Sequence, residues 1–372
     1  MAPRATPPFR ADHVGSLLRP PELLAAREDV AAGRIDAAEL RRIEDEAIRA
    51  AVRMQEEVGL KVATDGEFRR ASWHMDFIYA LDGISKEAGH IAVRFFNEDG
   101  EIEFTPAALH VDGKIGVSET IFGDAFSFLR EETSLVPKLT IPSPSMVHYR
   151  GGKASIDESV YPDLDSFWAD LTGAYREEVR RLGELGCTYL QLDDTSLAYV
   201  NDPHQREYIA SIGGDPERQH IEYIHHINEA LAGRPAGMSV TTHMCRGNFR
   251  SSWAASGDYE FVAEALFSEL EVDGFFMEWD DERSGSFAPL RFVPPGKTVV
   301  LGLVTTKHPE LETADELKRR IEEASRYVDV EQLCLSPQCG FSSTVEGNAL
   351  SADDQMRKLR LVVEVAEDVW GS

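Results

Sequence analysis

The sequence has little positive charge and no long apolar run. Only 38 of its 372 residues are Lys or Arg, against 65 Asp or Glu, so the formal net charge is -27. Such a field repels phosphate backbones and anionic membranes, and we therefore expect no nucleic-acid partner and no membrane partner. No apolar segment approaches the ~20 residues of a membrane-spanning helix. The first residues also lack the apolar centre of a secretory signal, which predicts a cytoplasmic protein.

Cysteine is equally scarce. The chain has four, at positions 187, 245, 334 and 339, and in a cytoplasmic protein these are expected to be free thiols rather than disulfides. Cys187 falls between a predicted helix and a predicted strand, and Cys334 falls within a strand, which is typical of buried, unreactive thiols. Cys245 and Cys339 stand at strand ends, so they are the two candidates for chemistry.

Short apolar runs alternate with amphipathic helices along the chain. Thr313 and Glu316 predict a helix start by a capping box, and Asp215 with Pro216 predicts another. The runs expected to be strands are residues 11–18, 62–65, 138–144, 188–194, 238–245, 274–279, 298–303 and 332–337. Strands that alternate with long helices imply a parallel sheet that is buried on both faces. Eight such units predict an α/β fold of the (β/α)8 TIM barrel type, as a single domain over residues 1–372.

One segment breaks this alternation. Residues 90–104, HIAVRFFNEDGEIEF, contain two β-prone runs around an NEDG turn, which predicts a β-hairpin. We expect the hairpin to be inserted after the second strand and to be followed by a helix near residues 119–134. The whole insertion would span residues 86–136 and form either a lid or a contact in a homodimer.

Reactive side chains stand at the ends of several predicted strands, where barrels of this kind place their chemistry. His243 and Cys245 are two residues apart in a strand-like run, so they face the same way. Glu278 and Cys339 end two later strands. Imidazole, thiolate and carboxylate are ligands that zinc accepts, so these four residues are candidate ligands for Zn2+. Each also has a structural alternative: a buried histidine with satisfied hydrogen bonds, a salt-bridged carboxylate, or inert thiols.

Two further histidines follow strand ends. His148 comes just after the third predicted strand, and His74 follows the second. Either side chain can line a pocket at the strand ends, and we include His148 among the candidate substrate-binding residues.

The motifs also resemble a known family. DHVGS near the start, TDGE at 64–67, LQLDD, HMC, a downstream Glu and a later PQCG occur in the order typical of the catalytic domain of cobalamin-independent methionine synthase. The resemblance spans about residues 10–370 and is closest to the short single-barrel members, of which epoxyalkane:coenzyme M transferase is a relative. It implies a zinc-bound thiolate that takes a methyl group from a 5-methyltetrahydrofolate-type donor, so that homocysteine becomes methionine.

This resemblance assigns roles to further residues. Glu67 and Asp193 would hold the homocysteine ammonium, and Ser16 would meet its carboxylate. Lys307 would stand where the synthase has a proton-relaying histidine, so we expect Lys307 and Asp193 to be catalytic.

The chain also departs from the family. The synthase has a tryptophan after its third strand, where this chain reads SPSMVHYRGG. His148 or Tyr149 could replace that ring, so the methyl donor stays open: a folate, a methylated corrinoid protein or a small methyl compound.

Three alternatives stay open from the sequence. The first is a zinc-dependent thiol alkyltransferase that opens an epoxide with coenzyme M. The second is a metal-free barrel similar to uroporphyrinogen decarboxylase, and the third is a non-catalytic binding protein.

Overall fold

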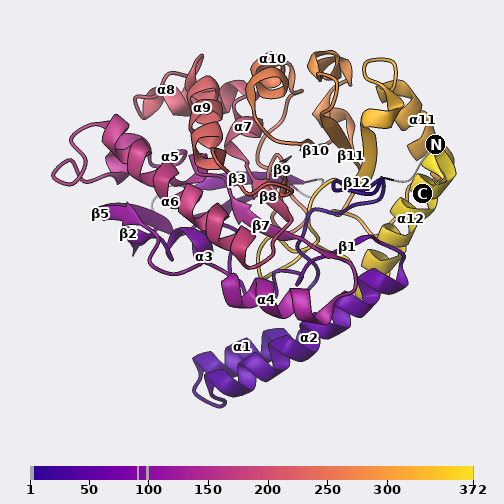
Figure 1. Ribbon diagram of the computed structural model, residues 1–372, viewed down its shortest axis with the longest axis horizontal. Coiled ribbons are helices and arrows are strands. Elements are labelled where there is room, and N and C mark those ends of the chain that lie inside the picture. The colour runs from indigo at the N-terminus through magenta and orange to yellow at the C-terminus, as the bar shows by residue number, and fades with distance from the viewer. Residues whose placement is uncertain (1–3, 90–91, 98–99, 372) are drawn as a thin grey trace.

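Parallel strands form the centre of the molecule. The computed structural model describes residues 4–89, 92–97 and 100–371. Six parallel strands form one sheet in the order β12-β11-β10-β9-β8-β7, so each strand lies beside the next one in the chain. They are β7 (Leu139–Pro142), β8 (Tyr189–Asp193), β9 (Ser239–Met244), β10 (Gly274–Glu278), β11 (Thr298–Val304) and β12 (Leu333–Pro337). This arrangement confirms the predicted α/β fold with a parallel sheet (Figure 1).

The first two expected strands are much shorter than predicted. β1 (Val62–Ala63) pairs in parallel with β6 (Val136–Pro137), and the backbone then continues through Lys138 into β7. Residues 11–18 form no regular strand. Instead Ala11 makes one parallel bridge to Leu335 on β12, after which the backbone turns at Gly15, whose φ is +149°. The prediction of a full strand at 11–18 is therefore wrong, although the segment does lie beside β12.

The helices that connect these strands lie on the outside of the sheet (Figure 1). The longer ones are α1 (Pro21–Ala31), α2 (Ala37–Glu57), α6 (Leu164–Glu184), α9 (Gln219–Leu231), α10 (Glu260–Glu269), α11 (Ala314–Ala324) and α12 (Ala352–Trp370). The shorter ones are α3 (Met75–Ile78), α5 (Ser145–His148), α7 (Ser196–Tyr199) and α8 (Pro203–Ser211). No described helix combines the length and the apolar character that crossing a bilayer requires.

Helix starts were predicted with mixed success. The Thr313 side chain accepts a hydrogen bond from the Glu316 amide at the start of α11, as expected. The prediction at Asp215 is wrong, because α9 begins only at Gln219. The Asp215 carboxylate accepts a hydrogen bond from the Glu217 amide within a turn that precedes the helix.

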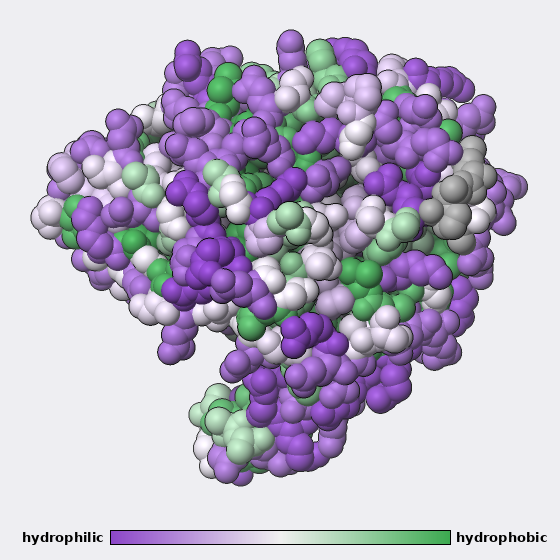
Figure 2. Space-filling model, viewed as in Figure 1, coloured by the Kyte–Doolittle hydropathy of each residue, from purple (hydrophilic) through white to green (hydrophobic). Residues whose placement is uncertain are grey.

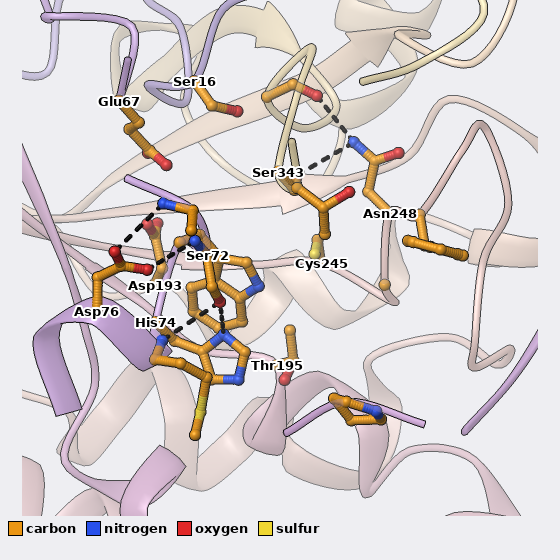
Figure 3. A pocket seen from close by; sticks show the side chains of 18 of the residues that line it. Ser16, Glu67, Ser72, His74, Asp76, Asp193, Thr195, Cys245, Asn248 and Ser343 are labelled. Atoms are coloured by element: carbon orange, nitrogen blue, oxygen red, sulfur yellow. Dashed lines mark hydrogen bonds between the residues drawn. The ribbon is translucent and has the colours of Figure 1, made fainter. Parts of the chain in front are cut away.

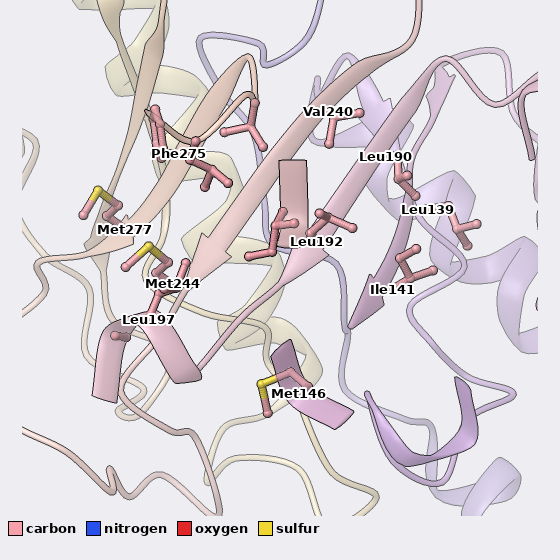
Figure 4. Packing of buried hydrophobic residues seen from close by; sticks show 14 of the residues in the cluster. Leu139, Ile141, Met146, Leu190, Leu192, Leu197, Val240, Met244, Phe275 and Met277 are labelled. Atoms are coloured by element: carbon pink, nitrogen blue, oxygen red, sulfur yellow. The ribbon is translucent and has the colours of Figure 1, made fainter. Parts of the chain in front are cut away.

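Both faces of the sheet are buried. Successive side chains of a strand point to opposite faces, and Figure 4 shows Leu190, Leu192, Val240 and Met244 together in the main cluster of buried apolar residues. A separate small cluster contains Val14, Phe276, Val300 and Cys334. His243 precedes Met244 and Cys245 follows it, so both point away from the face that Met244 occupies. The apolar face thus fixes the register that presents the imidazole and the thiol.

The predicted hairpin is present. β3 (Val93–Asn97) pairs antiparallel with β4 (Gly100–Phe104), while residues 90, 91, 98 and 99 lie outside the described residues. A second antiparallel pair, β2 (Asp82–Glu87) with β5 (Ala108–Gly116), flanks the hairpin and was not predicted. The following helix, α4 (Gly123–Glu132), falls where it was expected.

The hairpin contacts the loop that follows β9. The Phe96 amide donates to the Trp253 carbonyl oxygen at 2.7 Å, and the Trp253 amide donates back at 2.9 Å. Elsewhere, hydrophilic side chains cover most of the face shown in Figure 2, in keeping with the charge of the chain.

Candidate active site

A cavity of about 640 Å³ lies at the carboxyl ends of the parallel strands. Asp193 ends β8 and His243 belongs to β9, while Cys339 lies two residues beyond the end of β12. Ser16 and Glu67 reach the same cavity from the first two segments of the chain, and Figure 3 shows both side chains together with Asp193 and Cys245. Side chains from distant parts of the sequence therefore share one space.

The backbone at Glu67 explains how this side chain reaches the cavity. Gly66 and Glu67 both have left-handed backbone conformations, with φ of 67° and 60°. Such a conformation is uncommon for a residue other than glycine and carries a conformational cost. The two residues reverse the chain immediately after β1, which aims the Glu67 carboxylate inward.

Three side chains form a compact cluster of nitrogen and sulfur. The ligand atoms of His243, Cys245 and Cys339 all lie within 4.8 Å of one another, and all three residues are buried. Both ring nitrogens of His243 are buried without a hydrogen-bond partner among the described residues. An unsatisfied buried polar atom costs ~1–3 kcal/mol, and coordination of a metal removes that cost. One imidazole and two thiols are a donor set that suits zinc.

The two thiols of the cluster differ from the other cysteines. Hydrogen bonding with Cys245 lowers the pKa of Cys339 well below its ordinary value, and the same interaction raises the pKa of Cys245. Burial is the main cause that raises the pKa of Cys187 and of Cys334 to about 12. Those two thiols are buried, as predicted, and stay protonated at neutral pH.

Glu278 lies behind this cluster and is not one of its members. Its Oε1 lies 2.7 Å from Arg283 Nη2 and 3.2 Å from Lys307 Nζ, and its Oε2 accepts the Arg246 amide at 2.8 Å. Burial opposes ionisation of Glu278, but Lys307 and Arg283 lower its pKa below the usual range. Both carboxylate oxygens are therefore occupied by protein donors in this structure.

Lys307 is part of a buried ionic network. Its Nζ lies 2.6 Å from Asp280 Oδ2, and Lys307 is not among the residues that line the cavity. Asp280 was not among the residues predicted for the site, although it follows the end of β10 in the run WDDERS. The ammonium thus serves two carboxylates, Glu278 and Asp280, rather than facing the cavity.

Glu67 and Asp193 place two buried carboxyl groups at one end of the cavity. Burial raises the pKa of Asp193 to about 7, and it raises the pKa of Glu67 against the opposing effect of Arg70. Thr140 Oγ1 donates to Glu67 Oε1 at 2.9 Å, while Glu67 Oε2 is buried without a hydrogen-bond partner among the described residues. A cationic group on a ligand would satisfy this oxygen.

The two candidate histidines occupy different places. His148 is not among the residues that line the cavity: its Nδ1 lies 2.9 Å from Tyr223 Oη, and its ring packs near Trp168. This placement gives no support to a substrate-binding role. His74 does line the cavity, and its Nδ1 lies 3.1 Å from Ser72 Oγ.

An aromatic wall was missed by the sequence analysis. Trp73, Phe95, Phe104 and Phe249 all line the cavity, and the rings of Phe104 and Phe249 stack with centroids 4.6 Å apart. Phe95 and Phe104 belong to the hairpin, which therefore covers the cavity. The hairpin was predicted, but the surface against which it packs was not.

Comparisons with known proteins point to one family, that of the cobalamin-independent synthases. The profile described as "Cobalamin-independent synthase, Catalytic domain" matches residues 9–98 and 149–368. The uncharacterized protein YxjH of Bacillus subtilis (strain 168) is 47% identical over 366 residues, which are 98% of this chain and 95% of that protein. The methionine synthase of Pyrococcus abyssi is 27% identical over 331 residues, which are 88% of this chain and 85% of that protein.

A solved structure is similar over the whole chain. It comes from Listeria monocytogenes and is described as a candidate vitamin-B12 independent methionine synthase. It shares 39% sequence identity, has a TM-score of 0.79, and the match covers 99% of this chain and 100% of that one.

Proposed function

Because the chain belongs to the family of cobalamin-independent synthase catalytic domains, we propose that it moves a methyl group to the thiol of homocysteine to give methionine. One observation carries this proposal. The cluster of His243, Cys245 and Cys339 lines the same cavity as the buried carboxylates of Glu67 and Asp193. The first group suits a thiol-activating metal, and the second suits an amino-acid ammonium. A thiol amino acid fits both.

The proposed metal is Zn2+, held by His243, Cys245 and Cys339. Catalytic zinc sites keep three protein ligands and one open position, and these residues number three. Zinc bound there supplies a Lewis acid that favours the thiolate form of a thiol substrate near neutral pH. Glu278, the fourth ligand predicted from the sequence, remains a candidate only if Lys307 and Arg283 release it.

Glu67 and Asp193 would bind the ammonium of the amino-acid thiol, since a buried ammonium needs anionic acceptors. Ser16 also lines the cavity and would meet the carboxylate. Gly340 packs directly against the Ser16 hydroxyl. A Cβ added at Gly340 would lie 1.9 Å from the Ser16 Oγ, so any larger residue there would displace this hydroxyl. Lys307 would act by positioning Glu278.

The fold that carries this site is proposed to be a single (β/α)8 barrel over residues 1–372, with residues 86–136 as an insertion. The bridge from Ala11 to Leu335 and the pairing of β1 with β6 support closure, because they place the first segment beside the last strand and the second beside the third. A cytoplasmic location and a homodimer stay predictions from the sequence.

The second candidate function is a zinc-dependent thiol alkyltransferase that uses coenzyme M. Coenzyme M carries a sulfonate and no ammonium, so it brings no cationic group of its own to Glu67 and Asp193. These two carboxylates favour homocysteine. The methyl donor is proposed to be either a 5-methyltetrahydrofolate-type compound or a methylated corrinoid protein.

The proposal is tested by metal content and thiol specificity together. Purified protein should contain about one zinc per chain, form methionine from homocysteine with one of the two donors, and restore growth of a methionine auxotroph. Cys187→Ala is the control and should retain zinc and activity, because that thiol does not belong to the cluster. Alkylation of coenzyme M in preference to homocysteine would overturn the proposal.

A further inference from the structure

The helix α9 carries a second group of metal-ligand side chains, outside the cavity. His225, His226 and Glu229 lie in the run HHINE, and their ligand atoms all lie within 4.8 Å of one another. None of the three lines the cavity. Residues three and four apart are neighbours on the surface of a helix, so Glu229 lies beside both histidines. This spacing gathers two imidazoles and one carboxylate at one place on α9.

The Glu229 carboxylate faces both rings. Its Oε2 lies 2.9 Å from His226 Nδ1, and its Oε1 lies 3.6 Å from His225 Nε2. Each carboxylate oxygen thus approaches a ring nitrogen of a different histidine. The Arg176 guanidinium comes close as well, but it donates to the main-chain carbonyl oxygen of Glu229. This cation therefore does not occupy the carboxylate that a metal would use.

Packing between two helices holds one of these ligands in place. The helix α9 packs against α6 (Figure 1), and the His226 ring stacks on Trp168 of α6 with ring centroids 4.2 Å apart and planes 11° apart. The His226 side chain is only 17% exposed, whereas that of His225 is 68% exposed. A ligand that is already fixed loses less freedom on binding, while the exposed imidazole can turn toward an ion.

We propose that His225, His226 and Glu229 form a second metal site, open to solvent, for a divalent transition metal of the zinc, nickel and copper class. Imidazole suits these metals, and a carboxylate is an acceptable third ligand. The net charge of -27 raises the concentration of cations near the surface. Three protein ligands leave further coordination positions to water, so this metal exchanges with the solvent and is removed by dialysis. The proposal does not depend on the function proposed for the cavity.

Binding of Ni2+ to the untagged, dialysed protein tests this site, with equilibrium dialysis as the measurement. His225→Gln and Glu229→Gln should each raise the dissociation constant by at least about tenfold, because loss of a group that merely orients a metal ligand already costs about 10–100-fold. His204→Gln is the matched control and should leave the dissociation constant unchanged. His204 lies 3.7 Å from Glu207 on α8, but this pair belongs to no three-ligand cluster among the described residues.

Trp168 supplies a local signal for the same site. A paramagnetic ion such as Cu2+ that binds His226 lies close to the stacked indole and should quench its fluorescence. The quenching should be lost in Glu229→Gln and should fall in Trp168→Phe, which separates it from quenching of Trp73 at the cavity. Cys245→Ser should keep the Trp168 signal, because that thiol belongs to the other cluster. Failure of the cavity metal and failure of the α9 site are thus seen separately.

Competition with Mg2+ distinguishes a built site from simple attraction to a negative surface. Magnesium prefers oxygen ligands, so an equal concentration of Mg2+ should leave Ni2+ bound. Displacement of Ni2+ under these conditions would overturn the proposal, as would an unchanged dissociation constant in both His225→Gln and Glu229→Gln. Equal weakening in His204→Gln would also overturn it. Circular dichroism should show that each variant is folded, since the substituted side chains of His225 and His204 are exposed.

Discussion

The Lys307 ammonium lies 3.2 Å from the Glu278 carboxylate, and both side chains are buried. The Asp280 Oδ2 lies 2.6 Å from the same ammonium nitrogen. The cation therefore holds two carboxylates directly behind the thiol cluster. Removal of one partner from such a network leaves an uncompensated buried charge, which is expensive in a medium of low polarity.

Lys307→Met should destabilise the protein strongly, by about 3–5 kcal/mol in the free energy of unfolding, as is usual when a buried pair is broken. Denaturant unfolding of the purified protein measures this. Lys318→Met is the matched control, because Lys318 pairs with Asp368 at the exposed surface, and its stability should hardly change. Asp280→Asn in the Lys307→Met background should recover part of the loss, and full additivity of the two changes would contradict the network.

Cys245→Ser and Cys339→Ser should each lose zinc and turnover while the protein stays folded. The physical reason is that a hydroxyl is a poorer zinc ligand than a thiolate. Metal analysis after dialysis, with circular dichroism as the folding measurement, gives the result. Turnover that survives either substitution would remove the cluster from the mechanism.

Glu67→Gln should raise the KM for homocysteine by at least about tenfold, because it removes a charge-assisted hydrogen bond to the ammonium. Zinc content should not change, since Glu67 is not in the cluster. The measurement is initial-rate kinetics at a fixed donor concentration. A thiol without an ammonium, such as coenzyme M, is the control and should bind the variant no worse than the parent protein.

Glu178 on α6 should make stability depend on pH. Burial raises its pKa from 4.5 to about 8, so between these values the folded protein keeps a proton that the unfolded chain releases. The free energy of unfolding therefore falls as pH rises through this window. Thermal unfolding at pH 6 and pH 9 should show a smaller difference for Glu178→Gln than for the parent.

The neighbouring residue provides the control for this pH effect. Glu177 is partly exposed, and hydrogen bonds from Arg180 and Arg181 lower its pKa to about 2. It is ionised throughout the window, so Glu177→Gln should leave the pH dependence as it is. If both substitutions changed the pH dependence of the unfolding free energy equally, the effect would come from surface charge rather than from burial of Glu178.

The sequence predicted the parts of this structure that depend on local pattern. Alternation of side chains in β9 placed His243 and Cys245 on one face, and strand ends identified Cys339 as their partner in the cluster. Capping chemistry located the start of α11. These predictions succeed because the period of a strand and the chemistry of a cap are contained in a few consecutive residues.

Other features depend on tertiary packing between distant segments, and a local sequence pattern could not predict them. Glu278 was predicted as a metal ligand, but the pairing that occupies its carboxylate comes from Arg283 and Lys307 on different segments. His148 follows a strand end, yet its ring turns toward Tyr223 instead of the cavity. Residues 11–18 look like a strand in composition, but the backbone turn at Gly15 interrupts them.

The hairpin is attached to the loop after β9 by two main-chain hydrogen bonds, between Phe96 and Trp253. Bonds of this kind do not depend on which side chains the two residues carry. The attachment can therefore persist while the rings that face the cavity are exchanged during evolution. The hairpin can in this way present a different surface to the cavity without any change in the strands that carry Asp193 and His243.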